Sequence, residues 1–311
     1  MSECEDHAGE PASRAELSEL SRYRLNIAYD GTDFHGWGRQ PGDRTVQGVI
    51  EDALATILRR HPPAPRLIVA GRTDAGVHAT GQVAHVDLTP DQERALLRRR
   101  GRSAPDRGDD DTPDRALTKR INGILGQHSD VVVIESLRAP QGFDARFSAL
   151  WRRYEYRVGD ALAVNDPLQR HRTARVPVEL DVSQMTDAAD ALVGLHDFAA
   201  YCRPREGATT IRTLQDFRWS RDGDGVLVAA VKADAFCHSM VRALVGACVA
   251  VGEGKLTADD VVSLRDAGER TSSFAVMPAR GLTLVEVGYP ADSALAARAE
   301  QTRALRTLLP G

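Results

Sequence analysis

The sequence predicts an α+β fold in which two βαββαβ halves, each a split βαβ unit, form one continuous and mostly antiparallel sheet, with helices on one side and a central cleft. Three observations support this prediction. Strand-like and helix-like runs follow one another in the same order twice along the chain. The 311 residues are enough for one large domain or two ordinary ones. Apolar residues make up 42% and charged residues 27%, a balance typical of a globular protein with a sizeable core.

The first half, residues 23–146, contains the first set of elements. Its strand-like runs lie at 23–29, 66–70, 82–88 and 131–137. A helix is expected at 46–60, because its apolar side chains recur every three or four residues and Thr45 stands before them as an N-cap. A weaker helical pattern occupies 113–125. The predicted order is therefore β-α-β-β-α-β.

The second half, residues 147–290, repeats this order without repeating the residues themselves. Its strands are expected at 147–158, 211–219, 226–233 and 282–288. Its helices are expected at 182–194, 239–252 and 258–266. Two such halves side by side would leave a cleft where their sheets meet.

Three segments fall outside this pattern. Residues 1–22 hold six acidic and two basic residues without apolar periodicity, so we expect a disordered acidic tail. The other 289 residues hold 38 acidic and 38 basic side chains, a balance that permits an RNA partner without demanding one. Residues 89–114 run from basic to acidic and are expected to form an inserted mobile loop, whose arginines either touch phosphate or are simply solvated. Residues 291–311 are expected to be a tail with a frayed helix.

The sequence also excludes several classes of protein. No run approaches about 18 uninterrupted apolar residues, so no transmembrane helix is expected. The acidic, polar start of the chain lacks the features of a signal peptide. The four cysteines are scattered and form no CxxC pair, which argues against a zinc ribbon or a disulfide framework. A reduced, cytoplasmic location fits these observations best.

The stretch AGRTDAGVHATGQ (70–82) is the first candidate for chemistry. It is a glycine-rich loop between two predicted strands, and such a loop can present Asp74 in a fixed direction. The alternative is that Asp74 merely caps a turn. No second carboxylate lies nearby in sequence, which speaks against a glycosidase, and no zinc-deaminase motif is present. No metal site is therefore predicted.

Three other stretches mix glycine, arginine and aromatic residues: YDGTDFHGWGRQ (29–40), FDARFSALWRRYEY (143–156) and FCHSMVRALVG (236–246). Arg242 stands at the start of an otherwise apolar helix, where a charge usually requires a carboxylate partner. The alternative is a salt bridge that only braces an interface. Tyr154 and Tyr156 lie on the same face of a predicted strand, and for Tyr156 we expect ordinary sheet packing.

The stretch with Asp74 and the three stretches just named resemble the tRNA pseudouridine synthase A family, as do GLHDF (194–198) and GLTLVEVGY (281–289). The resemblance extends over about residues 23–290. The resemblance implies the pseudouridine synthase fold. It also implies isomerisation of uridine to pseudouridine at positions 38, 39 and 40 in the anticodon stem-loop of tRNA, with no cofactor and no metal. A homodimer that binds tRNA is implied as well.

The resemblance assigns roles to individual residues. Asp74 matches the family's nucleophile, Tyr154 the tyrosine that stacks on the target base and helps to remove the C5 proton, and Arg242 the arginine paired with the nucleophile. Arg72 matches the arginine that helps to extract the nucleotide from the helical stack. Leu282 and Leu284 match residues that wall the pocket.

Some positions depart from the family pattern. Gly38 stands where many members have Gln, and Ala243 where many have Asn. These departures bear on the contacts with tRNA rather than on the reaction. Two other functions remain in competition: a catalytically idle RNA-binding module on the same fold, and a hydrolase with an aspartyl nucleophile. The second lacks a partner acid or a metal motif in the sequence.

Overall fold

The computed structural model describes residues 20–97, 112–204 and 209–303. Our predictions for residues 1–19 of the acidic tail, for the basic run of the insertion and for the last residues of the C-terminal tail concern parts of the chain outside these ranges. The expected tail, 1–22, was too long, because its last two residues belong to the first strand, Ser21–Tyr29. The expected α+β class with a large, mostly antiparallel sheet is confirmed.

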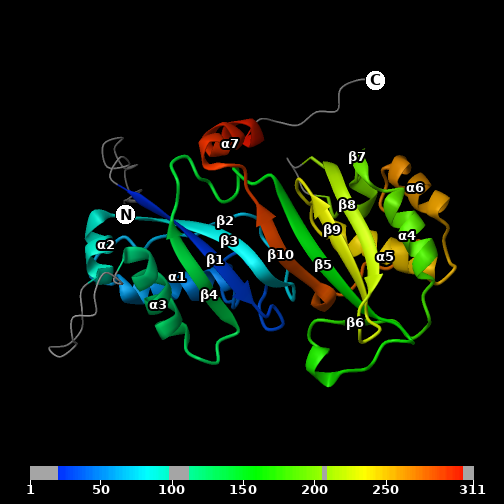
Figure 1. The fold of residues 1–311 in the computed structure, drawn as a ribbon, viewed down its shortest axis with the longest axis horizontal. Coiled ribbons are helices and arrows are strands. Elements are labelled where there is room, and N and C mark those ends of the chain that lie inside the picture. The colour runs from blue at the N-terminus through cyan, green and yellow to red at the C-terminus, as the bar shows by residue number, and fades with distance from the viewer. Residues whose placement is uncertain (1–19, 98–111, 205–208, 304–311) are drawn as a thin grey trace, which may run out of the picture.

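A sheet of ten strands runs through the whole molecule (Figure 1). Its main path is, in order, β4 (Val131–Arg138), β1 (Ser21–Tyr29), β3 (His78–Leu88), β10 (Leu282–Gly288), β5 (Trp151–Gly159), β9 (Leu227–Ala233), β8 (Ile211–Arg221) and β7 (Gly194–Asp197). Two short strands lie off this path: β2 (Ile68–Val69) pairs with β3, and β6 (Ala174–Arg175) pairs with β5. All pairs are antiparallel except β3 with β10 and β5 with β6. The parallel pair β3–β10 is where the two halves meet.

The helices gather at the two ends of the sheet. The N-terminal group contains α1 (Val46–Ile57), α2 (Pro90–Leu97) and α3 (Pro113–Leu125), and the C-terminal group contains α4 (Val182–Asp190), α5 (Met240–Gly252) and α6 (Ala258–Ala267). The last helix, α7 (Leu295–Arg303), lies beside the middle of the sheet (Figure 1).

The sequence patterns explain the central elements. In β1 every second side chain is buried, and the buried set includes Tyr23, Leu25 and Ile27. Thr45 caps α1 as expected, because its hydroxyl accepts a hydrogen bond from Gly48 N (3.2 Å). In α5 every residue except Arg242 is buried, so this helix is a core element of the C-terminal half.

Some boundaries differ from the predictions. β3 begins at His78, so the last residues of the glycine-rich stretch belong to a strand and the loop is shorter than expected. Residues 90–97 form α2 instead of a loop, and this helix buries Gln92 and Leu96 against the sheet's N-terminal end. Residues 295–303 form α7, which is anchored by the buried side chains of Leu295 and Ala299. Strands β6 and β7 were missed because two and four residues are too few for a pattern.

The cysteine prediction requires a correction. Cys202 and Cys237 form a disulfide with a Cα–Cα distance of 5.8 Å. They are 35 residues apart in sequence, and the β8–β9 hairpin between them brings them together, which a search for closely spaced pairs cannot detect. Cys248 is free and buried, and this burial raises the pKa of its thiol to about 12.

No helix among the described residues is both long enough and apolar enough to cross a membrane.

Candidate active site at the junction of the two halves

The register of the central strands brings the glycine-rich loop to the junction of the halves. His78, the first residue of β3, lies opposite Thr283 of β10, and Ala79 lies opposite Leu284. Leu284 in turn lies opposite Tyr154 of β5. The loop that ends at Val77 therefore enters the sheet next to the strands that carry Leu284 and Tyr154.

The loop itself, residues 71–77, is packed closely against residues 31–37. Trp37 N donates to Thr73 O (3.1 Å) and Gly76 N donates to Phe34 O (3.2 Å). A Cβ atom at Gly31 would lie 2.0 Å from Val77 O, so only glycine permits this approach. The stretch YDGTDFHGW is thus the support on which this loop, here called the catalytic loop, rests.

Buried hydrogen bonds also hold the catalytic loop in place. The Tyr29 hydroxyl and Thr73 Oγ1 are 2.8 Å apart. Gln82 Nε2 donates to the Tyr29 hydroxyl (3.2 Å) and to Gly71 O (3.0 Å). Burial raises the pKa of Tyr29 to about 12, so this hydroxyl stays protonated and keeps its place in the network.

Arg152 ties the loop to the C-terminal half. Its guanidinium donates to Ala70 O (2.7 Å), to Arg146 O (3.1 Å) and to Asp234 O (2.8 Å). Ala70 precedes the catalytic loop, whereas Asp234 follows β9, so one side chain spans the junction. Burial lowers the pKa of Arg152, and three backbone carbonyls partly replace the water that the guanidinium has lost.

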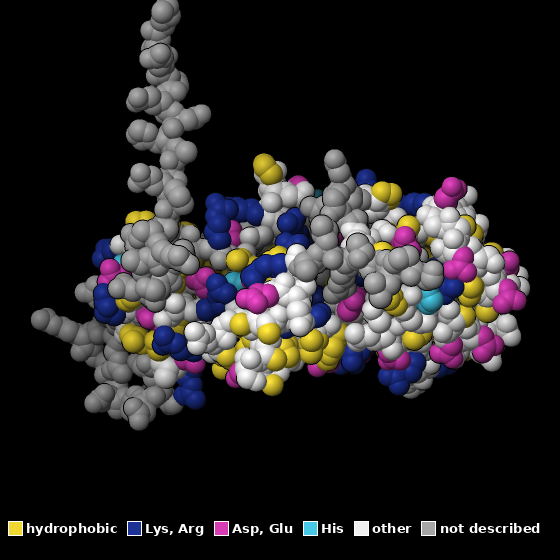
Figure 2. Space-filling model, turned by 90° about the horizontal axis from the view of Figure 1, so that it is seen from above, with side chains coloured by type: hydrophobic (Ala, Val, Ile, Leu, Met, Phe, Trp, Pro, Cys, Tyr) yellow, Lys and Arg dark blue, Asp and Glu magenta, His cyan; other side chains and the backbone are white. Residues whose placement is uncertain are grey.

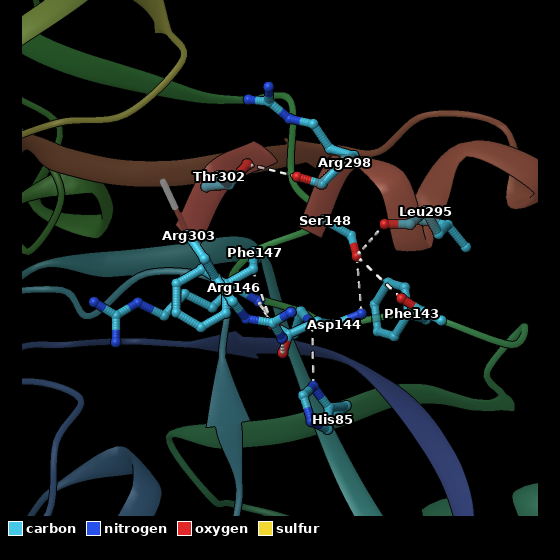
Figure 3. A network of polar contacts seen from close by, with 12 residues as sticks. His85, Phe143, Asp144, Arg146, Phe147, Ser148, Leu295, Arg298, Thr302 and Arg303 are labelled. Atoms are coloured by element: carbon cyan, nitrogen blue, oxygen red, sulfur yellow. Dashed lines mark hydrogen bonds and ion pairs between the residues drawn. The ribbon is translucent and has the colours of Figure 1, made fainter. Parts of the chain in front are cut away.

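The segment that carries Arg146 is fixed in turn by α7 (Figure 3). Ser148 Oγ donates to Leu295 O (3.1 Å) and accepts from Asp144 N (3.0 Å). On the other side, Ala145 N donates to Nδ1 of the buried His85 (3.0 Å). Burial lowers the pKa of His85 to about 4, so the ring is neutral and Nδ1 can accept. The chain after β10 therefore helps to hold the segment on which Arg152 depends.

Asp74 lies at the exposed tip of the catalytic loop. Its side chain is 34% exposed, and its backbone carbonyl accepts from Val77 N (3.2 Å) in a turn. Among the described residues, the contact recorded for its carboxylate is with His238, with 3.5 Å between Nε2 and Oδ1. The main chain is thus firmly held while the carboxylate stays accessible to a substrate.

Tyr154 is 8% exposed and lies beside Asp74. Its ring meets Phe236 edge to face, with 5.1 Å between the ring centroids. Burial is the main cause that raises the pKa of Tyr154, and Asp74 adds to the rise. The phenol is therefore protonated at neutral pH.

Arg242 differs from our expectation. Its Nε donates to Met277 O (2.6 Å), and its own carbonyl accepts from Met277 N (3.1 Å). Among the described residues, Arg242 and Asp74 form no ion pair, because the guanidinium is turned to the backbone that leads towards β10. The expected pairing is therefore not present in this structure, and the alternative of a brace fits the observed contacts of Arg242.

The remaining predicted residues lie around the junction. Arg72 is exposed on the catalytic loop, and its Cδ would lie 3.5 Å from a Cβ atom at Gly38. Leu284 is fully buried opposite Tyr154, and Leu282 is 6% exposed opposite Tyr156. Tyr156 is packed as expected, with its hydroxyl donating to Pro278 O (2.6 Å).

Two features were not recognised in the sequence. Arg152 was read only as part of a motif, and a buried guanidinium bonded to three carbonyls leaves no sequence pattern. His238 stands in FCHSMVRALVG, four residues before Arg242, and a polar ring just before an apolar helix could have marked it. We call residues Phe236–Ser239 the entry segment of α5.

A cavity of about 150 Å³ is lined by residues of the C-terminal half, among them Arg280, which precedes β10. Four arginines and two aspartates contribute to its walls: Arg157, Arg170, Arg175, Arg280, Asp166 and Asp224. Its wall touches the start of β3, because His78 Nε2 donates to Arg280 O (3.1 Å). Among the described residues, no group of three or more His, Cys, Asp and Glu side chains is arranged to hold a metal ion.

Comparisons with known proteins show the family of the chain. A family model described as tRNA pseudouridine synthase matches residues 188–290. The chain is 65% identical over 290 residues to tRNA pseudouridine synthase A of Leifsonia xyli subsp. xyli, which covers 93% of this chain and 99% of that protein. It is 54% identical to the protein of that name from Frankia casuarinae (92% and 96% covered) and 48% identical to that from Mycobacterium leprae (94% and 97%).

Proposed function

The chain belongs to the tRNA pseudouridine synthase A family, and on this premise we propose that it isomerises uridine to pseudouridine at positions 38, 39 and 40 in the anticodon stem-loop of tRNA. The observation that carries the proposal is the position of Asp74. Its carboxylate is exposed at the junction of the halves, on a loop whose backbone is fixed by buried hydrogen bonds. A nucleophile requires this combination of a fixed backbone and a side chain that the substrate can reach.

The reaction breaks the N1–C1′ bond of uridine, turns the base and joins C5 to C1′. The proton on C5 is lost and N1 gains one, so the product is an isomer of the substrate. We propose that Asp74 supplies the electron pair, either to C1′ of the ribose or to C6 of the base. The detached uracil must be held while it turns, which requires an enclosed site with a stacking surface.

Tyr154 is proposed as that stacking surface. Its ring is fixed by Phe236 and by its place in the central sheet. Because the raised pKa keeps the phenol protonated, Tyr154 can accept the C5 proton only while it passes its own proton on. Leu284, opposite Tyr154, and Leu282 are proposed to form the apolar wall of the pocket.

Arg72 and Arg242 are proposed to act on the nucleic acid and on the site. Arg72 is exposed next to Asp74, so it can fill the space that the flipped nucleotide leaves in the stem-loop. Arg242 uses Nε for Met277 O, and we propose that its two outer nitrogens serve the bound substrate or Asp74 once tRNA is present.

The charge distribution supports an RNA partner. The face shown in Figure 2 carries a group of Lys and Arg side chains near its middle. Four arginines line the cavity of the C-terminal half, and arginine binds phosphate oxygens through paired N–H groups. We further propose that the protein is cytoplasmic, acts as a homodimer and needs no cofactor.

Tritium release tests the proposed function. tRNA transcripts that carry [5-³H]uridine at positions 38–40 are incubated with the protein, and both released tritium and pseudouridine in the product are measured. Release with pseudouridine formation supports the proposal. Binding without release would favour an idle RNA-binding module, and neither binding nor release would favour a different enzyme. Activity that survives chelation would support the proposal that no metal cofactor is needed. A mass of twice 33.8 kDa in solution would support the homodimer.

A further inference from the structure

We propose that His238 is a positioning residue for Asp74, and that a hydrogen bond from its Nε2–H fixes the direction of the carboxylate. The inference rests on the proposed function, because that function makes Asp74 the nucleophile. Nε2 lies 3.5 Å from Oδ1, and no other ion pair or hydrogen bond among the described residues reaches this carboxylate. A small closing movement would bring the two atoms within hydrogen-bond distance.

The backbone next to His238 adopts an unfavourable conformation. Ser239 has φ 65° and ψ 5°, the left-handed region, and it is the non-glycine residue with positive φ in the described part of the chain. Serine takes this conformation at a cost, and such strained positions collect at functional sites. Ser239 precedes α5 but does not cap it with its hydroxyl, so capping does not explain the strain. The residue directly before this position is His238, whose Nε2 lies 3.5 Å from Asp74 on the catalytic loop.

Contacts on both sides of His238 hold its backbone in place. Arg203 N donates to His238 O (2.9 Å), and Met240 N donates to Cys237 O (3.1 Å). Cys237 is joined to Cys202, and Phe236 packs against Tyr154. The His238 side chain is 41% exposed, and its Nε2 lies 3.5 Å from Oδ1 of Asp74.

A hydrogen bond to a single donor suits the carboxylate of a nucleophile. A single donor on one carboxylate oxygen sets the orientation of Asp74 and leaves the other oxygen free to attack. In this structure Nε of Arg242 donates to Met277 O, and the contact recorded for the Asp74 carboxylate among the described residues is the one with His238.

Two substitutions test the proposal. His238→Phe keeps a ring but removes the donor, whereas His238→Gln places an amide N–H at a reach similar to Nε2. We expect His238→Phe to lower the single-turnover rate by about 10- to 100-fold, and His238→Gln to stay within about threefold of the original protein. tRNA affinity should change by less than about threefold, and Tm by less than about 2 °C, because the side chain is largely exposed.

A matched control uses His128, which is exposed in the turn between α3 and β4. His128→Phe should leave rate, affinity and Tm unchanged. The proposal is overturned if His238→Phe turns over as fast as the original protein. It is also overturned if His238→Gln is as slow as His238→Phe, since the N–H would then not be what matters. An original protein that forms no pseudouridine would instead contradict the proposed function.

Discussion

The catalytic loop and the entry segment of α5 reach the same site from opposite halves, but they are held in different ways. The catalytic loop is fixed by buried hydrogen bonds, among them those of Thr73 and Gly76, and by the close approach of Gly31. The entry segment is fixed by packing of Phe236, by one disulfide and by a strained backbone at Ser239. The first places Asp74, and the second places the groups around it.

This difference indicates a division of labour. Hydrogen bonds with defined geometry hold the position of the group proposed to react. The entry segment carries side chains that lie around this group, His238 among them, and its strained backbone persists because the surrounding structure holds it. Substitutions in the two regions should therefore fail in different ways: those in the loop should move Asp74, and those in the segment should alter its partners.

Asp74→Asn should abolish the contribution of the catalytic loop to turnover. The amide keeps the shape but is not a nucleophile, so we expect turnover to fall to background. tRNA affinity should change by less than about threefold, because phosphate contacts supply most of it. Single-turnover kinetics and a binding assay on one preparation measure both quantities. A variant that retained a tenth of the rate would show that Asp74 is not the nucleophile.

Tyr154→Phe separates stacking from proton transfer on the strand between the two regions. We expect normal tRNA binding and a rate about 10²-fold lower, the usual scale for loss of an acid–base group. Because burial raises the pKa of Tyr154, the original protein should show no rise in rate between about pH 7 and 9 from ionisation of this tyrosine. Equal rates for the Phe variant and the original protein would leave Tyr154 as a stacking surface alone.

Arg242→Lys distinguishes a catalytic role from a brace at the C-terminal side. Lysine keeps the charge but lacks both the Nε donor to Met277 O and the planar pair of outer nitrogens. We expect the rate to fall by about 10²-fold with tRNA affinity changed by less than about threefold. Thermal unfolding of the same sample gives the second quantity. A lower Tm with a fully active folded fraction would make Arg242 a structural brace only.

Thr73→Val sharpens the description of the catalytic loop. It removes the hydrogen bond between Thr73 and Tyr29 in a buried place, and we expect the free energy of unfolding to fall by about 1–2 kcal/mol. The rate should fall by more than the loss of folded protein explains, because the residue next to Asp74 is loosened. Thr80→Val, at an exposed position of β3, is the matched control. Equal effects of the two substitutions would contradict the assigned role of the Tyr29–Thr73 bond.

Ser239→Gly should have the smallest effect and concerns the strain in the entry segment. Glycine adopts a positive φ without the clash of a Cβ atom, so the folded state should gain up to about 1 kcal/mol. The rate should stay within about threefold, since the path of the backbone is kept. Urea unfolding measures the gain. A loss of stability would mean that the Ser239 side chain makes a contribution larger than the strain it causes.

The sequence by itself predicted the α+β class and most of the long elements, because apolar spacing is a local property. β1, α1, α5 and β10 follow from alternation or from helical spacing in windows of seven or more residues. The motif around Asp74 also marked the family, which the comparisons then showed. The short strands β6 and β7 pair because neighbouring strands provide partners, and this cannot be recognised from two or four residues.

The tertiary structure alone decided which groups meet at the site. Arg152, His238 and Arg242 lie 78, 164 and 168 residues from Asp74 in the chain, and a few ångströms of side-chain reach separate residues that contact it from residues that do not. The sequence shows that Arg242 needs an acceptor, but not that the acceptor is Met277 O instead of a carboxylate. Likewise, the pairing of Cys202 with Cys237 depends on the fold of a hairpin between them. Local spacing specifies the elements, whereas contacts between distant residues are set only when the sheet closes over the junction of its two halves.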